Sequence, residues 1–237
     1  MKDKVIILAG GKGSRLKPYT SILPKPLMPI DKYSILEIII KQLSNQKFKN
    51  IILSVNHQAY LIQSYFGNGS KWGVNIEYVK ENKILSTMGP LKLINNLTDN
   101  FLIMNGDILT SLNFRNFLSY HKKNKNLFTI SSNFRTENVN YGVLKTNSKK
   151  NLLKFVEKPK LDYQVSMGIY AANIKILNYI PKNKFFGFDH LMIKLLQKNK
   201  KINVKEFRGY WRDIGRPEDF ELANKEFSKY KKKLIND

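Results

Sequence analysis

The hydrophobic residues of this chain form short runs, some with the pattern of a strand and others with the pattern of a helix. Residues 5–9 (VIILA) are continuously apolar and end at glycines, which is typical of a strand buried on both faces of a parallel sheet. The apolar stretch 35–43 (ILEIIIKQL) predicts a buried helix. Residues 74–79 (VNIEYV) alternate apolar and polar side chains, as half-buried strands do. The first part of the chain therefore alternates strands with helices.

The other expected elements extend this order. Further strands are predicted over residues 50–55 and 101–104, and helices over residues 57–66, 89–95 and 113–123. The second half is richer in strands, over residues 127–134, 142–145, 152–156 and 165–171, before helices return over residues 189–198 and 217–230. This order predicts an α/β fold with a doubly wound, mostly parallel, Rossmann-like sheet and an inserted antiparallel half. No repeat or linker interrupts residues 1–237, so we expect one domain.

Composition narrows the function classes. The 237 residues are 42% hydrophobic and 25% charged, an ordinary globular balance. The chain has no cysteine, which excludes disulfides, zinc–thiolate sites, iron–sulfur clusters and cysteine nucleophiles. No apolar run approaches the roughly 20 residues of a membrane span, and the N-terminus lacks a signal pattern. We therefore expect a cytoplasmic protein with no membrane partner.

The net charge of +23, from 41 basic and 18 acidic residues, would suit a nucleic-acid binder. However, only six of the basic residues are arginine, at Arg15, Arg115, Arg135, Arg208, Arg212 and Arg216. The lysines are spread along the whole chain, whereas nucleic-acid domains concentrate arginine and aromatic side chains on one face. We expect no functional nucleic-acid binding, and we expect the positive field to favour anionic substrates.

A glycine-rich segment, LAGGKGSRL (residues 8–16), follows the first predicted strand directly. Glycines let backbone N–H groups close on a phosphate, and the helical turn after them adds its positive end. Neither standard nucleotide fingerprint fits, because a Walker A loop needs another spacing and a dinucleotide motif needs glycine where Leu16 stands. A tight turn that binds nothing stays the alternative interpretation.

A proline-rich segment, LPKPLMPI (residues 23–30), comes next. Its three prolines stiffen the loop, so Lys25 is expected to be held in place beside the glycine turn. A fixed cation beside a phosphate-binding turn suits phosphoryl chemistry. A surface lysine between prolines is the alternative.

These two segments resemble the signature of the sugar-1-phosphate nucleotidyltransferases, the NDP-sugar pyrophosphorylases. Further motifs stand in the family's order: LSTMGPL (85–91), NGD (105–107), YGV (141–143), VEKP (156–159), MGIY (167–170) and WRDIGRPED (211–219). The resemblance covers essentially the whole chain, and the mannose-1-phosphate guanylyltransferase-like branch is the most similar. It implies a GT-A-like fold, with a nucleotide-binding part over roughly residues 1–112 and a sugar-binding, second-metal part over roughly residues 113–237.

The resemblance implies that a nucleoside triphosphate and a sugar 1-phosphate give an NDP-sugar and pyrophosphate, by in-line attack at the α-phosphorus with Mg²⁺. Arg15 and Lys25 would then be the catalytic cations, contacting the triphosphate and the developing charge. Asp107 and Asp213 would bind the metal, since Mg²⁺ takes hard oxygen ligands.

The two carboxylates also have ordinary alternatives. Asp107 could serve as a strand-end turn or helix cap. Asp213 could form a salt bridge with Arg212 or Arg216.

The family pattern also assigns the two substrates. The nucleotide would lie against Leu8, Ala9, Gly10, Gly11, Gly13, Glu81, Gly89 and Asp107. The sugar phosphate would lie against Gly142, Glu157, Lys158 and Gly168. In that assignment Glu157 accepts hydrogen bonds from sugar hydroxyls and Lys158 holds the phosphate. Without the resemblance, Glu157 and Lys158 would be interpreted as an exposed charge pair.

The identity of the base is inferred from Glu81. A carboxylate at Glu81 only accepts hydrogen bonds, which matches the two adjacent donors of guanine and favours GTP. Thymine and uracil present an acceptor–donor–acceptor edge that a glutamine would serve better. A solvated Glu81 beside Lys80 is the alternative. Where the family usually has glycine and alanine, this chain has Ser86 and Met88, and we expect Met88 to narrow the base or sugar pocket.

The leading expectation is thus an enzyme that makes an activated sugar for surface polysaccharide or glycan synthesis. Alternatives are the same reaction with dTTP, UTP or CTP, including a CTP:phosphocholine-type cytidylyltransferase, and a non-catalytic regulatory subunit of the same fold. If the chain were a non-catalytic regulatory subunit, we would expect Lys25, Asp107 and Asp213 to be lost, yet all three are present. A homo-oligomer is a further possibility, and we expect no left-handed β-helix domain of the kind that some relatives carry.

Overall fold

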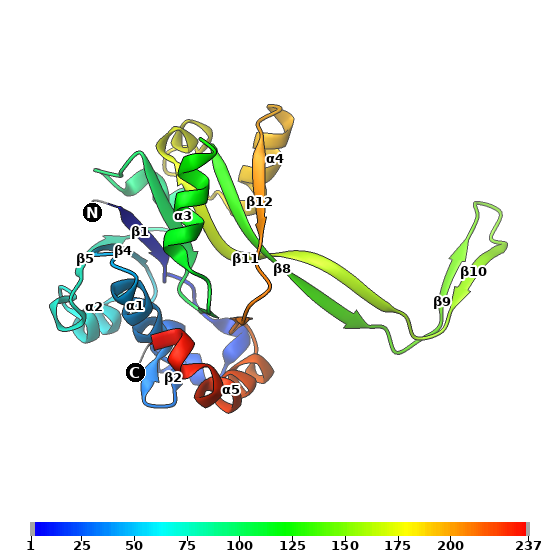
Figure 1. Cartoon of the computed structure of the whole chain (residues 1–237), viewed down its shortest axis with the longest axis horizontal. Helices are drawn as coiled ribbons and strands as arrows, with labels where there is room; N and C mark the ends of the chain where they lie inside the picture. The colour runs from blue at the N-terminus through cyan, green and yellow to red at the C-terminus, as the bar shows by residue number, and fades with distance from the viewer. Residues whose placement is uncertain (1–2, 236–237) are drawn as a thin grey trace.

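The computed structural model describes residues 3–235, built around one seven-stranded sheet. Its strands lie in the order β12 (Ile202–Glu206), β8 (Phe128–Asn138), β11 (Lys160–Asn173), β6 (Asn100–Asn105), β1 (Lys4–Leu8), β4 (Asn50–Val55) and β5 (Asn75–Lys80). Neighbouring strands are parallel except at β11, which runs antiparallel to both β6 and β8. The mostly parallel α/β sheet expected from the sequence is confirmed (Figure 1).

Five helices cover this sheet within the described residues: α1 (Ile35–Asn45), α2 (Ala59–Phe66), α3 (Phe114–Lys123), α4 (Phe188–Gln197) and α5 (Pro217–Ile235). Their ends follow local chemistry. The Ser34 hydroxyl accepts from the Glu37 N–H at the start of α1, at 3.1 Å, and Gly67 caps the C-terminus of α2. Short 3₁₀ turns, η5 (Gly89–Leu93) and η6 (Ile174–Tyr179) among them, connect the rest.

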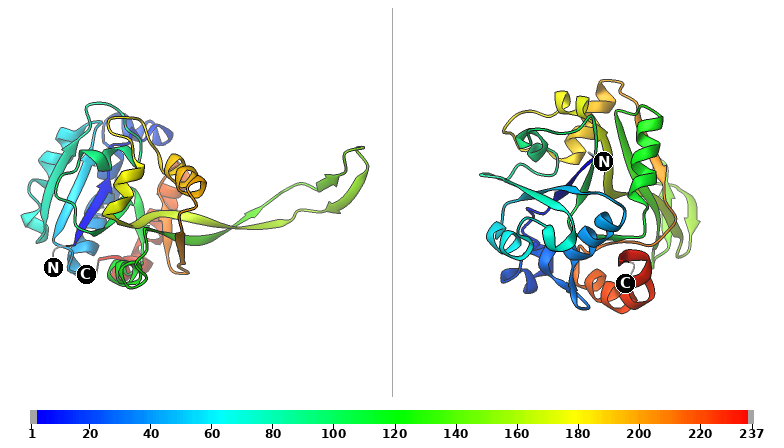
Figure 2. Two further views of the ribbon diagram at one scale, coloured as in Figure 1. Left: turned by 90° about the horizontal axis from the view of Figure 1, so that it is seen from above. Right: turned by 60° about the vertical axis from the view of Figure 1, so that its left-hand side comes forward.

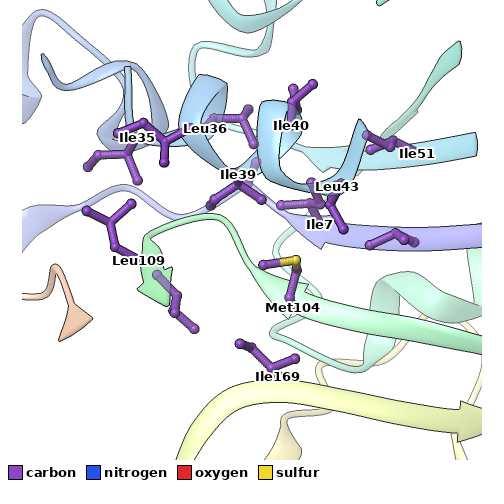
Figure 3. Close-up of a cluster of buried hydrophobic side chains, with 14 of the residues drawn as sticks. Ile7, Ile35, Leu36, Ile39, Ile40, Leu43, Ile51, Met104, Leu109 and Ile169 are labelled. Atoms are coloured by element: carbon purple, nitrogen blue, oxygen red, sulfur yellow. The ribbon is translucent and has the colours of Figure 1, made fainter. Parts of the chain in front are cut away.

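Alternating side chains of the central strands enter two cores, one on each face of the sheet. Val5 and Ile7 of β1 join the core beneath α1, α2, α3 and α5, whereas Ile6 joins the core beneath η5, η6 and α4. Figure 3 shows the first core, with Ile39 of α1 above Ile7 and Met104 of β6. Burial of each such side chain stabilises the fold by about 1.5–3 kcal/mol.

Two strands continue beyond the sheet as an arm. β8 and β11 stay paired from Ser132↔Ser166 to Asn138↔Lys160, and we call this part the ribbon. The arm tip, residues 139–159, contains the antiparallel hairpin of β9 (Val143–Thr146) and β10 (Leu152–Val156). The arm extends away from the body in Figure 1 and in the left view of Figure 2. The sequence predicted these four strands but not the length of β8 and β11.

Two small sheets were not predicted either. β2 (Pro29–Ile30) pairs with β3 (Tyr33–Ser34), and β7 (Ile108–Thr110) pairs with β13 (Trp211–Asp213). Strands of two or three residues are too short to show the periodicity from which strands are predicted.

In the part of the chain that the structure describes, no helix has the length and apolar character needed to cross a membrane.

The buried His121 of α3 should make the stability of this fold pH-dependent. Burial, helped by the charge of Lys122, lowers the pKa of His121 to about 4. The neutral ring is favoured in the folded state, so this stability is fully present above the unfolded pKa of about 6.5 and is lost as the pH falls toward 4. We expect the free energy of unfolding to drop by about 3 kcal/mol over that window.

Urea denaturation at several pH values measures this loss. His121→Gln should flatten the slope between pH 6.5 and pH 4, whereas the half-buried His57→Gln should leave it unchanged. An equal slope in wild type and His121→Gln would contradict the assignment.

Candidate active site

The first cavity opens at the carboxyl ends of β1 and β6. From β1 the chain winds outward to β4 and β5 and then returns to place β6 on the other side of β1. Loops leave in opposite directions at such a point, which creates the crevice where α/β proteins bind ligands. The cavity has a volume of about 250 Å³. It is lined by Leu8, Ala9, Gly10, Gly11, Lys25, Pro26, Glu81, Ile84, Ser86, Thr87, Asn105, Gly106 and Asp107.

The glycine turn forms one wall of this cavity and has no room for side chains at two positions. A Cβ at Gly10 would lie 3.1 Å from the Glu81 carboxylate. Gly13 adopts a φ of 61°, and a Cβ there would come within 2.8 Å of Thr20. The turn therefore presents backbone rather than side chains to the cavity, as phosphate binding requires.

Lys25 faces this turn from the proline-rich loop. It begins the short 3₁₀ turn η3 (Lys25–Leu27) between Pro24 and Pro26, and only 8% of the residue is exposed. Its ammonium group forms a close ion pair with Oδ2 of Asp107. The other oxygen, Oδ1 of Asp107, is buried and has no hydrogen-bond partner among the described residues. The cation is thus held in place, and the carboxylate has one oxygen unused.

Asp213 lies beside Asp107, although 106 positions separate them in the sequence. The pairing of β7 with β13 brings them together, because Asp213 lies opposite Ile108 and the Ile214 N–H donates to the Asp107 carbonyl at 3.0 Å. Burial raises the pKa of Asp213, and the charge of Asp107 raises it further, while Lys25 and Arg15 oppose the shift. Such a pair of carboxylates attracts a cation.

This carboxylate pair suits a metal that brings most of its own ligands. Among residues 3–235, no group of three or more histidine, aspartate or glutamate side chains could hold a metal ion. Mg²⁺ is commonly bound through one or two carboxylates, with water and substrate phosphates completing its shell. The unpartnered Asp107 oxygen and the neighbouring Asp213 fit that pattern.

A second cavity, of about 510 Å³, adjoins the carboxylate pair at the root of the arm. Its walls are formed by Arg15, Arg135, Glu137, Val165, Trp211, Asp213, Gly215, Arg216, Glu218 and Asp219. Half of the six arginines of the chain therefore meet here, and the Arg135 guanidinium stacks 4.9 Å from the centre of the Trp211 ring. Arg135 and Arg216 were missed by the sequence analysis. The rarity of arginine among so many lysines was the signal that could have found them.

Glu81 is not the solvated residue of the alternative interpretation. It is 9% exposed, and its two oxygens accept hydrogen bonds from the Ser54 hydroxyl, at 3.0 Å, and the Leu85 N–H, at 3.1 Å. Burial raises the pKa of this carboxyl, and the two hydrogen bonds partly counteract the shift. The side chain lines the first cavity and also anchors the loop that follows β5.

Two residues of the predicted nucleotide site do not line either cavity. Gly13 packs against Thr20 and Lys25, and Gly89 lies where a Cβ would meet Leu85, so both position neighbours. The expectation that Met88 narrows the pocket is wrong. Its side chain is fully buried in the core beneath η5 and α4, because the 3₁₀ turn directs it inward.

The predicted sugar-phosphate residues are divided between the body and the arm. Gly168 lies at the arm's root with a φ of 72°, packed against the Asn105 amide. Glu157 and Lys158 follow β10 on the arm tip, line neither cavity, and form an exposed pair 3.9 Å apart. Gly142 lies beside them, and a Cβ there would clash with Phe155 and meet Glu157 at 3.0 Å. One chain therefore does not bring these residues to its own cavities.

Two characterised enzymes are similar to this chain in sequence over most of its length. UTP–glucose-1-phosphate uridylyltransferase of Synechocystis is 30% identical over 92% of this chain and 61% of its own length. Mannose-1-phosphate guanylyltransferase of Mycobacterium tuberculosis is 28% identical over 91% of this chain and 62% of its own length. This chain thus spans about three fifths of these relatives.

Among solved structures, HddC of Yersinia pseudotuberculosis superposes with a TM-score of 0.75 at 27% identity, covering 95% of this chain and 99% of that one. Another structure of HddC contains GMP-PN. The sequence model of the nucleotidyl transferase family matches residues 4–229, which include both cavities and the arm. The chain belongs to the nucleotidyl transferase family.

Proposed function

We propose that this protein transfers a nucleotidyl group from a nucleoside triphosphate to a sugar 1-phosphate, giving an NDP-sugar and pyrophosphate. The observation that carries the proposal is the juxtaposition of Asp107, Asp213 and Lys25 beside a glycine turn at the switch point of the sheet. The family match and the names of the relatives support the same reaction.

The main role of the protein in this reaction is to align two anions, the nucleoside triphosphate and the sugar 1-phosphate. Backbone N–H groups of the glycine turn would bind the triphosphate, with the Lys25 ammonium and the Arg15 guanidinium beside it. An oxygen of the sugar phosphate attacks the α-phosphorus, and the bond to the bridging oxygen of the β-phosphate breaks in line. The attacking oxygen is already an anion, so no proton needs to be removed. Pyrophosphate takes the displaced electron pair, and Lys25 stabilises the added charge.

We propose Mg²⁺ as the cofactor, held by Asp107 and Asp213. When bound, it supplies charge neutralisation between the carboxylates and the substrate phosphates. Lys25 contacts one Asp107 oxygen and leaves the other unpartnered, so both cations can share this carboxylate. Burial and the neighbouring Asp107 disfavour the charged form of Asp213 and so raise its pKa. A bound dication would stabilise that negative charge.

The second cavity is the proposed sugar-phosphate subsite. Arg135 and Arg216 are available there for the phosphate, and Glu137 for sugar hydroxyls. Glu157, Lys158, Gly142 and Gly168 complete the proposed contacts. Residues 1–112 would then serve the nucleotide and residues 113–237 the sugar, within one catalytic domain. We expect a cytoplasmic enzyme whose product feeds polysaccharide or glycan synthesis.

GTP is the proposed nucleotide, with Glu81 as the acceptor for the guanine donors. The guanylyltransferase relative and the GMP-PN complex of HddC support this choice. Because another relative is a uridylyltransferase, UTP is the second candidate nucleotide, together with dTTP and CTP. A non-catalytic subunit is disfavoured, because Lys25, Asp107 and Asp213 are not only retained but lie close to one another.

Pyrophosphate release tests the reaction class. GTP, dTTP, UTP, CTP and ATP are each incubated with Mg²⁺ and a series of sugar 1-phosphates, including mannose, glucose and heptose phosphates. We expect release only when both substrates are present, and most with GTP. Release that does not depend on any sugar phosphate would reject the proposal in favour of nucleotide hydrolysis.

Glu81→Gln should move the nucleotide preference from GTP toward a pyrimidine nucleotide. The amide offers one acceptor and one donor, so it loses a hydrogen bond to guanine and gains one to uracil or thymine. We expect the GTP:UTP ratio of kcat/KM to fall by about 10-fold or more. Glu77→Gln, on the exposed edge of β5, is the control and should keep the ratio. An unchanged ratio in Glu81→Gln would remove Glu81 from base recognition.

A further inference from the structure

The arm exposes more large apolar side chains per residue than the rest of the described chain. Of the twenty large hydrophobic side chains that are exposed within residues 3–235, nine lie in the thirty residues from 134 to 163. They are Phe134, Tyr141, Val143, Leu144, Leu152, Leu153, Phe155, Leu161 and Tyr163. An isolated two-stranded hairpin is marginally stable in water, and contiguous apolar patches mark interaction surfaces. The arm therefore requires a partner surface.

The arm's own body is not that surface. Seven consecutive residue pairs, from Ser132↔Ser166 to Asn138↔Lys160, continue the ladder of the central sheet outward. At about 3.3 Å per residue, this ribbon carries the tip about 20 Å from the sheet. Folding the tip back over its own cavities would break that ladder, whereas contact with a second molecule leaves it intact.

The body offers features that complement the arm tip. The tip contains five lysines and one glutamate, a net charge of +4. Residues 212–226, beside the second cavity, contain five acidic and three basic residues, a net charge of −2. An apolar groove of about 410 Å³ lies between the ribbon, α4 and β12, with Val165, Met192 and Val204 among its walls. Each copy thus has both the projecting element and a receiving surface.

We propose that two copies of this chain exchange arms, so that each arm tip lies over the cavities of the other copy and brings Glu157 and Lys158 to its sugar-phosphate subsite. The identity of that subsite rests on the proposed function. A two-fold pair makes the same contact twice, which closes the assembly at a dimer. Two arms contribute eighteen exposed apolar side chains, so burying about 60 Å² of each reaches the ~1,000 Å² of a specific interface.

Light scattering after size-exclusion chromatography tests the exchange without any substrate. We expect wild type to be a dimer. Leu144→Ser combined with Leu153→Ser, two side chains about three fifths exposed on the arm tip, should give monomers with an unchanged circular dichroism spectrum. Tyr60→Ser, at a similarly exposed position of α2, should stay dimeric. A monomeric wild type, or a dimer that both arm substitutions leave intact, would overturn the exchange.

Complementation tests which copy receives the arm. Asp107→Asn chains carry a defective cavity and an intact arm, and chains with Glu157→Gln and Lys158→Asn carry the reverse. Heterodimers purified through two different tags contain one complete site only if arms cross between copies, so they should recover about half of the wild-type activity. Each variant alone should be nearly inactive. Heterodimers as inactive as the parents would overturn the exchange, even if the protein is a dimer.

The two proposals can fail separately. If wild type releases no pyrophosphate with any substrate pair, the proposed function is wrong. Light scattering then decides the exchange, which stands if the arm substitutions dissociate the dimer and falls if they do not.

Discussion

Asp107→Asn should lower kcat by about 10²- to 10⁴-fold while the fold persists. Asparagine keeps the shape of the side chain but removes the charge that pairs with Lys25 and the second carboxylate oxygen of the proposed Mg²⁺ site. The loss should appear in kcat at saturating substrate, because the lost interaction acts on the charge that develops during transfer.

Asp31→Asn is the matched control. Asp31 lies on an exposed loop with a φ of 55°, a conformation that asparagine also adopts readily, and it lines neither cavity. Its kcat should equal that of wild type. Turnover of Asp107→Asn within twofold of wild type would remove this carboxylate from the mechanism.

Lys25→Met should lower kcat/KM by about 10²- to 10³-fold, because the buried ammonium both binds the triphosphate and stabilises the leaving pyrophosphate. Methionine fills a similar volume without charge, so packing between Pro24 and Pro26 is kept. Lys182→Met, at an exposed position, is the control and should have no effect.

A pH profile separates this electrostatic role from a merely structural one. The charge of Lys25 lowers the pKa of Asp213, so its removal should raise that pKa. The acid limb of kcat/KM should therefore move to higher pH in Lys25→Met. Mg²⁺ should also raise the melting temperature more in this variant than in wild type, because two close carboxylates have lost their cation. An unshifted acid limb would contradict the assignment.

The position of the first cavity could be predicted from local sequence, whereas the chemistry expected there came from the family resemblance. A continuous apolar run followed by glycines predicts a turn at the end of β1, and two flanking prolines fix Lys25 beside it. Asp107 follows a buried strand in the same way. Each of these features depends on neighbours within a few residues, which is the range over which periodicity and turn chemistry operate.

Other features depend on contacts that no local pattern encodes. Asp213 reaches Asp107 through β7 and β13, which are three residues each and leave no periodicity. Met88 is directed into the core by the backbone of the following 3₁₀ turn. The arm exposes both of its faces, so its apolar residues do not reveal where it lies in a single chain. In the proposed exchange, the second copy supplies the surface that these residues cover.

The most direct test of the nucleotidyl transfer follows the phosphorus atoms. GTP labelled with ³²P at the α or the γ position is incubated with Mg²⁺ and the best sugar 1-phosphate, and the products are separated before and after phosphatase treatment. We expect the α label in a sugar nucleotide that resists phosphatase and the γ label in pyrophosphate. An α label recovered only as free GMP, or a γ label released as orthophosphate, would contradict transfer to the sugar phosphate and with it the central claim.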